Sequence, residues 1–218
     1  MSVLRLAERL GQLKMLLNLS SGLVCGSQPI DLERMAEDCA GAPPADASFA
    51  YANAKRMAET MCAAARTQSR IPTISVRPFS FIGPYQGLDT PWAQTNFMAD
   101  AFNGNSIRVW GDGETVRSYL YGADVAFWML RILTAGESGQ VFNVGSDQPV
   151  KLLSLAGEIS KNFSPTPEIK LNSSTLVRGR NRLVPEISRA RKELGLDVFT
   201  PLPTAVQRTV NWHRLSRG

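Results

Sequence analysis

The sequence is poor in residues that bind metals or cross-link a chain. Its 218 residues include three cysteines and one histidine. Cys25, Cys39 and Cys62 are odd in number and lack metal-ligand spacing, so we interpret all three as reduced thiols. His213 has no second ligand candidate near it in the sequence, which argues against a metal-binding or catalytic histidine. We therefore expect no metal site and a cytoplasmic protein.

Long uncharged apolar runs are also missing. The apolar stretch over residues 1–26 is interrupted by Arg5, Glu8, Arg9 and Lys14, so it cannot cross a bilayer and does not resemble a secretory signal. Hydrophobic residues make up 44% of the chain and charged residues 20%, which is ordinary for a globular protein. We expect one large domain, or one and a half small ones, with no membrane contact.

A glycine-rich dinucleotide turn is absent as well. Dinucleotide-binding folds place G-x-G-x-x-G between their first strand and first helix, where backbone N–H groups approach the pyrophosphate. The only similar letters, GDG at 111–113, separate two short strand candidates and predict a hairpin turn. The first predicted element is a helix over residues 3–13, with no strand before it. We interpret the chain as the second half of a longer fold.

Strands and helices alternate along the chain. Apolar runs over 14–21 and 72–79 predict buried parallel strands, and 140–145 predicts another. The stretch 26–47, rich in Pro, Gly, Asp and Ala, predicts a long loop of the kind that is usually functional. Helices are expected over residues 3–13, 48–66, 93–102, 124–133, 152–162, 188–194 and 203–215. This alternation predicts an α/β fold with a parallel sheet.

The net charge of +5 is scattered, except for the cluster RGRNR at 178–182. A nucleic-acid patch is one interpretation of this cluster. No basic helix or aromatic-studded basic strand accompanies it, so we favour a small anionic ligand and expect no nucleic acid partner.

The stretch YANAK places Tyr51 and Lys55 four residues apart in a predicted helix, and therefore on one face. A phenol ionises well above neutral pH, and a cation a few ångström away favours phenolate. The pair is thus a candidate acid/base, although the same spacing arises by chance on many helix surfaces. Ser21 ends the first predicted strand, at the edge where α/β sheets present functional groups. Its hydroxyl is suited to donating to a substrate oxygen.

Several blocks in order resemble the extended short-chain dehydrogenase/reductases, specifically the NAD-dependent nucleotide-sugar epimerase/dehydratase family. The matching blocks are LLNLSSGLVCG, AEDCAGAPPADASFAYANAKRMAE, VRPFSFIGPYQG, VWGDGETVRSYLYGADVA, VFNVGSDQPVKLLSLA and SRARKELGL. The resemblance implies a partial Rossmann-type parallel sheet and a smaller α/β substrate-binding subdomain. We expect residues 1–90 to form the truncated dinucleotide-binding portion with the Ser/Tyr/Lys site. Residues 91–218 would be mainly the substrate-binding subdomain, with some segments returning to the sheet.

The resemblance also implies residue roles. Tyr51 would be the catalytic acid/base, Lys55 would bind the nicotinamide ribose, and Ser21 would hydrogen-bond the reacting sugar hydroxyl. Pro78, Phe79 and Ser80 would pass beside the nicotinamide. Together with Tyr51 and Lys55, these three residues make up the expected cofactor contacts.

Substrate contacts are expected from three more residues. Asn96 matches a position near the nucleotide-sugar phosphates, while Arg117 and one arginine of 178–182, for which we take Arg180, would pair with the diphosphate.

Departures from the family pattern narrow the expected reaction. Cys25 stands where the family often has Tyr, so we expect no substrate contact from an aromatic ring there. Ser80 stands where some epimerases have Asn, which weakens a strict UDP-galactose 4-epimerase interpretation. The sugar 4,6-dehydratases place Asp-Glu after the position that corresponds to Ser21 and use the carboxylates to eliminate water, whereas this chain has Gly22 and Leu23 there. We therefore rank dehydration below 4-epimerisation and 4-keto reduction.

Roughly the first hundred residues of the family, which cradle adenine and pyrophosphate, have no counterpart in the sequence. We therefore expect a truncated form with an incomplete NAD or NADP site, a nucleotide-diphosphate sugar as ligand, and a homodimer. A non-catalytic sugar-nucleotide-binding or interaction module is the alternative.

Overall fold

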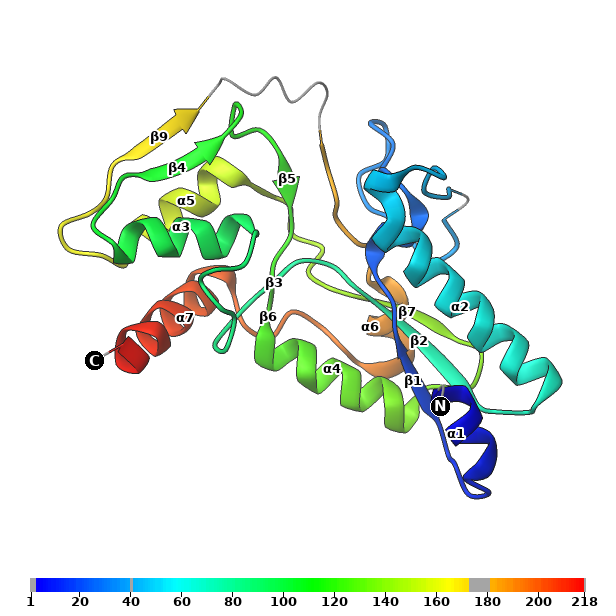
Figure 1. Ribbon diagram of the computed structural model, residues 1–218. Coiled ribbons are helices and arrows are strands. Elements are labelled where there is room, and N and C mark those ends of the chain that lie inside the picture. The colour runs from blue at the N-terminus through cyan, green and yellow to red at the C-terminus, as the bar shows by residue number, and fades with distance from the viewer. Residues whose placement is uncertain (1–2, 40, 173–180, 218) are drawn as a thin grey trace.

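The computed structural model describes residues 3–39, 41–172 and 181–217. Its central feature is a parallel sheet in which β2 (Thr73–Pro78) lies between β1 (Leu16–Leu19) and β7 (Val141–Val144). Helices pack on this sheet, so the α/β class expected from the sequence is confirmed (Figure 1).

The middle strand β2 has the buried character that its β-branched sequence predicts. Ile74 and Val76 are fully buried. The expectation of a buried strand at 14–21 was wrong: β1 is only partly buried, and Leu19 is 49% exposed. Within the described residues, β1 pairs with β2 alone, so an apolar run here marks a sheet edge.

Helices cover both faces of the sheet. On one side, α2 (Ala50–Gln68) packs on β1 and β2, with α1 (Val3–Arg9) near its C-terminal end. On the other side lie α4 (Gly122–Ala135) and α6 (Ser188–Leu194), which contact β7. Trp128 of α4 is fully buried among the side chains of β2 and β7, and these residues form one apolar core.

A second core lies in the other lobe of the molecule (Figure 1). There β4 (Ile107–Trp110) and β9 (Ile169–Asn172) pair in parallel, α3 (Ala93–Phe102) and α5 (Leu152–Ser160) pack against β4, and α7 (Leu202–Arg217) packs on α5. Its fully buried members include Met98, Ile107, Leu155, Ile159 and Val206.

Short strand pairs join the two lobes. The pair β3 (Phe81–Ile82) and β6 (Leu120–Tyr121) is parallel, whereas β5 (Val116–Arg117) and β8 (Val150–Lys151) are antiparallel. The hairpin expected at 111–113 is therefore wrong. Glycines 111 and 113 do adopt positive φ, but β4 finds its partner in β9, far along the chain.

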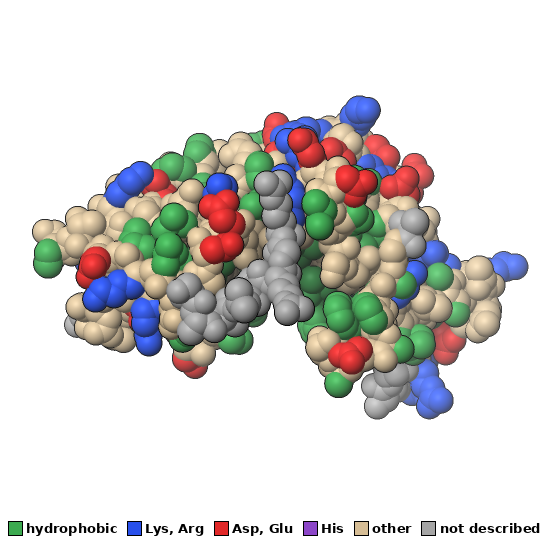
Figure 2. Space-filling view, turned by 90° about the horizontal axis from the view of Figure 1, so that it is seen from above, with side chains coloured by type: hydrophobic (Ala, Val, Ile, Leu, Met, Phe, Trp, Pro, Cys, Tyr) green, Lys and Arg blue, Asp and Glu red, His purple; other side chains and the backbone are tan. Residues whose placement is uncertain are grey.

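The stretch 26–47 was predicted to be a long loop, and its described residues up to 46 form no helix or extended strand; they lie between two short 3-10 turns, η1 (Gly22–Cys25) and η2 (Ala47–Phe49). Asp46 caps the second turn, because its side chain accepts from the Ser48 backbone N–H at 2.8 Å. On the face shown in Figure 2, Lys and Arg side chains are interspersed with Asp and Glu.

Candidate active site

Helix α2 presents Tyr51, Lys55 and Glu59 at successive four-residue spacings, which places them on one face. The Tyr51 side chain is 57% exposed and lines a cavity of about 550 Å³. The Lys55 ammonium nitrogen lies 5.7 Å from the centre of the Tyr51 ring. The phenol is thus open to a ligand and has a cation beside it.

Lys55 is fixed by the sheet. Its Nζ donates to the Leu19 carbonyl oxygen, 2.8 Å away, at the carboxyl end of β1. An ammonium has three hydrogens, so this contact leaves two for a ligand.

Ser21 lies just beyond the same strand end, and only 7% of it is exposed. Its Oγ accepts from the Leu23 backbone N–H at 3.2 Å and caps η1. The side chain is not among those that line the Tyr51 cavity. Since a hydroxyl accepts and donates at once, the Ser21 hydrogen stays available as a donor.

The cavity is walled by segments far apart in the sequence. Its lining residues are Leu23, Gly26, Ser27, Gln28, Ile30, Ser48, Phe49, Tyr51, Ala52, Arg117, Asn181, Arg182 and Leu183. The long loop predicted to be functional supplies one wall, and β5 with residues 181–183 supplies another.

Arg117 brings a positive charge into this cavity. Its Nη1 donates to the carbonyl oxygens of Val116 at 2.8 Å and Asn181 at 3.3 Å. None of the ion pairs found among the described residues involves Arg117. Burial lowers the pKa of the Arg117 guanidinium, because desolvation opposes its charge. Burial also raises the pKa of the nearby Tyr119 phenol to about 12, so Tyr119 is neutral at physiological pH.

The basic cluster at 178–182 reaches the cavity through Arg182, which was not singled out from the sequence. Its Nε donates to the Glu33 carbonyl oxygen at 2.9 Å. Arg180, the residue chosen from the cluster, lies outside the described residues. The sequence indicated only that Arg182 belongs to a basic cluster. It could not show which arginine of that cluster lines the cavity.

The residues expected beside the nicotinamide lie at the carboxyl end of β2: Pro78 is the last residue of the strand, and Phe79 and Ser80 follow it. Pro78 pairs with Val144 of β7, and the Phe79 backbone N–H donates to the Val144 carbonyl oxygen at 2.9 Å. The Phe79 ring packs against Gly22, where a Cβ would be 2.6 Å from ring carbons. The Ser80 carbonyl oxygen accepts from the Leu120 N–H at 3.2 Å. This strand end thus lies beside the segment that follows Ser21.

Asn96 is placed apart from these residues. It is exposed on α3 and lines a second hollow of about 350 Å³ together with Asp100, Arg108 and Trp110. Arg108 is paired there with Asp100 at 2.7 Å.

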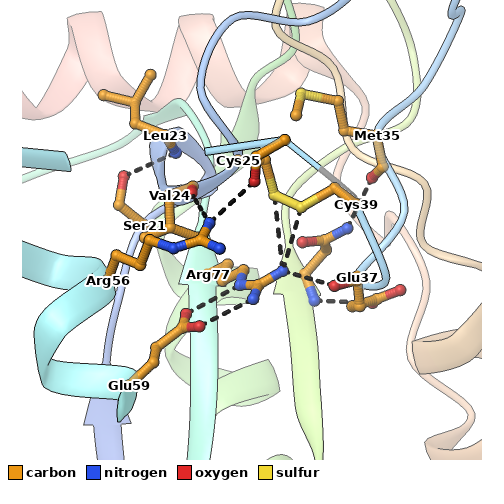
Figure 3. Close-up of a disulfide and its surroundings, with 12 residues drawn as sticks. Ser21, Leu23, Val24, Cys25, Met35, Glu37, Cys39, Arg56, Glu59 and Arg77 are labelled. Carbon is orange, nitrogen blue, oxygen red and sulfur yellow. Dashed lines mark hydrogen bonds and ion pairs between the residues drawn. A yellow bond between two sulfur atoms is a disulfide. The ribbon is translucent and has the colours of Figure 1, made fainter. Parts of the chain in front are cut away.

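A buried ion pair that was not predicted from the sequence lies one helical turn beyond Lys55, at Glu59. Arg77 of β2 forms two hydrogen bonds to the Glu59 carboxylate, at 2.9 and 2.8 Å (Figure 3). Both side chains are largely buried. Burial opposes ionisation of Glu59, but the hydrogen bonds and charge of Arg77 outweigh it and leave the pKa of the carboxyl lowered.

The expectation of three reduced thiols was wrong. Cys25 and Cys39 form a disulfide, and only Cys62 is free and buried. Their separation of 14 residues carries no recognisable pattern, and the long loop that folds back between them could not be placed from sequence.

Taken together, the cavity holds a phenol, a nearby ammonium and two guanidinium groups. A phenol that is open to a ligand can exchange protons with a hydroxyl or carbonyl. Guanidinium groups bind phosphate oxygens, often in bidentate fashion. This arrangement suits a ligand that carries both a phosphate and a sugar-like hydroxyl.

The family profile described as "NAD dependent epimerase/dehydratase family" matches residues 1–145, which is more than half of the chain. The chain belongs to this family. A Streptomyces sp. dTDP-4-dehydro-6-deoxy-D-allose reductase is 30% identical to it over 169 residues, covering 77% of this chain and 51% of the relative. A UDP-glucuronic acid decarboxylase 1 of Xenopus tropicalis is 27% identical over 164 residues, covering 75% and 38%.

Solved structures of the epimerase/dehydratase family share the fold. UDP-glucose 4-epimerase of Thermotoga maritima, determined with UDP-glucose, superposes with a TM-score of 0.87 at 19% identity, covering 99% of this chain and 68% of that one. UDP-glucuronic acid 4-epimerase of Bacillus cereus, determined with NAD, gives 0.83 at 18% identity, covering 99% and 66%. The chain spans about half the length, or less, of the curated relatives described above.

Among the described residues of this family member, no helix combines the length and apolar character needed to cross a membrane.

Proposed function

We propose that the chain supplies the substrate site and the acid/base of an NAD(P)-dependent nucleotide-sugar epimerase or 4-ketoreductase. The observation that carries this proposal is the single cavity shared by the Tyr51 phenol and the Arg117 guanidinium. A sugar nucleotide needs both, because its diphosphate is an anion and its reacting hydroxyl must gain or lose a proton.

In the proposed reaction, Tyr51 donates a proton to a sugar carbonyl oxygen during reduction, and accepts one from the hydroxyl during oxidation. Lys55, held by the Leu19 carbonyl oxygen, keeps a positive charge beside the ring where the proton is exchanged. Ser21 would donate its hydroxyl hydrogen to the same sugar oxygen and orient it.

Arg117 and Arg182 would hold the diphosphate, with Arg180 as a further proposed contact. Neither Arg117 nor Arg182 is ion-paired within the described chain, so both can accept an anionic partner. Asn96 faces the second hollow, so its proposed contact with the nucleotide requires the substrate to extend from the Tyr51 cavity to that hollow.

The residues at the carboxyl ends of β1 and β2 fit the nicotinamide end of a cofactor. Lys55 has ammonium hydrogens to spare for ribose hydroxyls, and Pro78, Phe79 and Ser80 follow the adjacent strand end. A bound nicotinamide would accept or supply the hydride. Because the sequence has no glycine-rich turn, we propose that another part of the whole protein, or a second polypeptide, holds the adenosine and pyrophosphate.

The relative that is a 4-dehydro-sugar reductase favours reduction over epimerisation. Gly22 and Leu23, which carry no carboxylate, disfavour a 4,6-dehydratase, since elimination of water needs an acid and a base beyond Tyr51.

The oligomeric state, the cellular location and the domain division are also proposals. We propose a homodimer, because α1 and α2 carry exposed apolar side chains, among them Leu6, Met57 and Met61. We also propose a cytoplasmic location, and a division near residue 90 between the dinucleotide-binding portion and the substrate portion.

A non-catalytic sugar-nucleotide-binding module is the second candidate, because the chain covers only about half of its reductase relative. Calorimetry with UDP- and dTDP-sugars tests the binding that both candidates share. Turnover of a nucleotide 4-ketosugar with NAD(P)H, measured after the chain is combined with the cofactor-binding half of a relative, separates them: binding with turnover supports the enzyme, and binding without turnover supports the module. Absence of sugar-nucleotide binding would overturn both.

A further inference from the structure

The Cys25–Cys39 disulfide closes the loop that forms one wall of the Tyr51 cavity. Cys25 ends η1, and Cys39 lies 14 residues further along the chain. Between them, Gly26, Ser27, Gln28 and Ile30 line the cavity. The bond therefore links the two ends of a segment that any ligand of this cavity would meet.

A buried cation sits directly against both sulfur atoms. Nη1 of Arg77 lies 3.7 Å from Sγ of Cys25 and 3.7 Å from Sγ of Cys39 (Figure 3). The same nitrogen donates to the Glu37 carbonyl oxygen at 2.7 Å, and the Glu59 carboxylate holds the rest of the guanidinium. Arg77 is 9% exposed, so little water screens its charge.

A guanidinium in this position stabilises thiolate relative to thiol. Stabilisation of the reduced form makes a disulfide easier to reduce, and such bonds are the exchangeable ones. Disulfides that occur in reducing compartments are usually redox-sensing or catalytic. We propose that Cys25 and Cys39 form an exchangeable redox site that reacts with dithiols, and that its oxidation state sets the order of the segment 22–39.

The exchange balances with a dithiol as the reductant. Its thiolate attacks Sγ of Cys39, the more exposed of the two cysteines, and forms a mixed disulfide. The Cys25–Cys39 bond breaks, and Cys25 leaves as a thiolate beside Arg77. The second thiol of the reductant then attacks the mixed disulfide, releases Cys39 and leaves as a cyclic disulfide. Two electrons pass to the protein, and the reductant is oxidised.

The surrounding backbone keeps the two cysteines close after reduction. Nη1 of Arg56 donates to the carbonyl oxygens of Val24 at 2.8 Å and Gly41 at 2.9 Å, and so holds the chain beside each cysteine. The backbone at Gly41 packs so closely against the Cys25 carbonyl oxygen that a Cβ at this position would clash with it. These contacts do not involve sulfur, so they favour re-formation of the bond on oxidation.

Reduction removes the covalent link from a small apolar cluster. Val24, Cys25, Met35 and Phe79 form its core, and Cys39 and Leu183 pack against it. The loop keeps other attachments, such as the hydrogen bond from the Met35 N–H to the Val184 carbonyl oxygen at 2.8 Å. We therefore expect local loosening of 22–39 without unfolding.

The first test is a redox titration in mixtures of reduced and oxidised dithiothreitol. Cys62→Ser is present throughout to remove the third thiol, and alkylation with mass spectrometry counts the reduced cysteines. The double variant Arg77→Gln/Glu59→Gln removes the cation without leaving a buried carboxylate unpaired. It should need at least a tenfold higher ratio of reduced to oxidised reagent for half-reduction, about 30 mV. Equal midpoints would contradict the proposal.

Arg77→Lys keeps a cation beside the sulfurs and should titrate within threefold of the parent. A shift as large as that of the double variant would also count against the proposal.

The second test is hydrogen exchange with and without reductant. We expect faster exchange in residues 22–39 on reduction, unchanged exchange in α3 and α5, and no response in a Cys25→Ala/Cys39→Ala variant. Unchanged exchange in 22–39 would refute the proposed coupling to the loop. Neither test requires a sugar nucleotide, so failure of the proposed function leaves both results interpretable.

Discussion

Lys55 lies between Tyr51 and the end of β1: its ammonium donates to the Leu19 carbonyl oxygen at 2.8 Å and stands 5.7 Å from the centre of the Tyr51 ring. The lysine therefore carries out two tasks with one group. It ties α2 to the strand end, and it places a cation near the phenol. In the proposed function, the phenol at the wall of the cavity that it shares with Arg117 exchanges a proton with the bound sugar.

Tyr51→Phe should separate chemistry from binding. The variant keeps the ring and loses the proton, so turnover with a nucleotide 4-ketosugar and NAD(P)H should fall by at least about 10²-fold. The assay combines the chain with the cofactor-binding half of a relative. Sugar-nucleotide affinity, measured by calorimetry, should change by no more than about tenfold, since only one neutral hydrogen bond is lost. Undiminished turnover would exclude Tyr51 as the acid/base.

Gly22→Ala tests the contact between the Ser21 segment and the end of β2. A Cβ at this position would be 2.6 Å from carbons of the Phe79 ring. We expect a loss of about 1–3 kcal/mol in the free energy of unfolding, typical of overpacking. Denaturant unfolding measures it.

Gly157→Ala is the matched control for Gly22→Ala. Gly157 lies in α5, and a Cβ added there would meet no neighbouring side chain or distant backbone within 4 Å. Because alanine has the higher helix propensity, this variant should gain about 0.5–1 kcal/mol. Similar destabilisation of both variants would show that the Phe79 contact is not specific.

Glu59→Gln tests the buried ion pair between Glu59 and Arg77. Breaking one partner of a largely buried pair should lower the free energy of unfolding by about 3 kcal/mol at neutral pH. Glu114→Gln, which breaks a half-exposed pair with Lys151, should cost less than about 1 kcal/mol.

The same glutamate predicts a pH dependence. The pKa of Glu59 is lowered in the folded protein from an ordinary value of 4.5, so the unfolded chain binds its proton first as the pH falls. The stability contributed by the ionised carboxylate is therefore complete above pH 4.5 and is lost below it. Thermal unfolding between pH 7 and pH 3 should show a steeper loss for the parent than for Glu59→Gln. Parallel curves would contradict the lowered pKa.

Self-association is testable on the exposed face of α2. Met57 and Met61 are 59% and 50% exposed. If this face forms the dimer, Met57→Lys/Met61→Lys should yield a monomer in sedimentation velocity. Leu171→Lys, an exposed position on β9 in the other lobe, should leave the assembly unchanged. A parent chain that is monomeric at all concentrations would dismiss the dimer.

The features predictable from the sequence are those set by local pattern. The bounds of α3 and α6 match those expected from the sequence, and the four-residue spacing of Tyr51 and Lys55 places them on one helix face. These features need no knowledge of distant segments.

Features that depend on distant partners were not predictable. The strand β4 pairs with β9, so the turn at 111–113 gave a misleading hairpin signal. The Cys25–Cys39 bond depends on how the loop folds back onto η1, and the Glu59–Arg77 pair depends on β2 lying beside α2. The spacing of Tyr51, Lys55 and Glu59 offered a signal for Glu59, but the partner charge comes from a strand, and no local rule identifies it.

The most direct measurement is calorimetric titration of UDP and a UDP-sugar into the parent chain, Arg117→Ala and Lys192→Ala. Lys192 is an exposed cation on α6, away from the cavity, and controls for net charge. Loss of a charge-assisted contact should weaken binding to Arg117→Ala by about tenfold or more, since such bonds contribute about 1.5–3 kcal/mol. Lys192→Ala should bind within twofold of the parent. Equal affinities for all three proteins would show that the sugar nucleotide does not occupy the cavity shared by Tyr51 and Arg117.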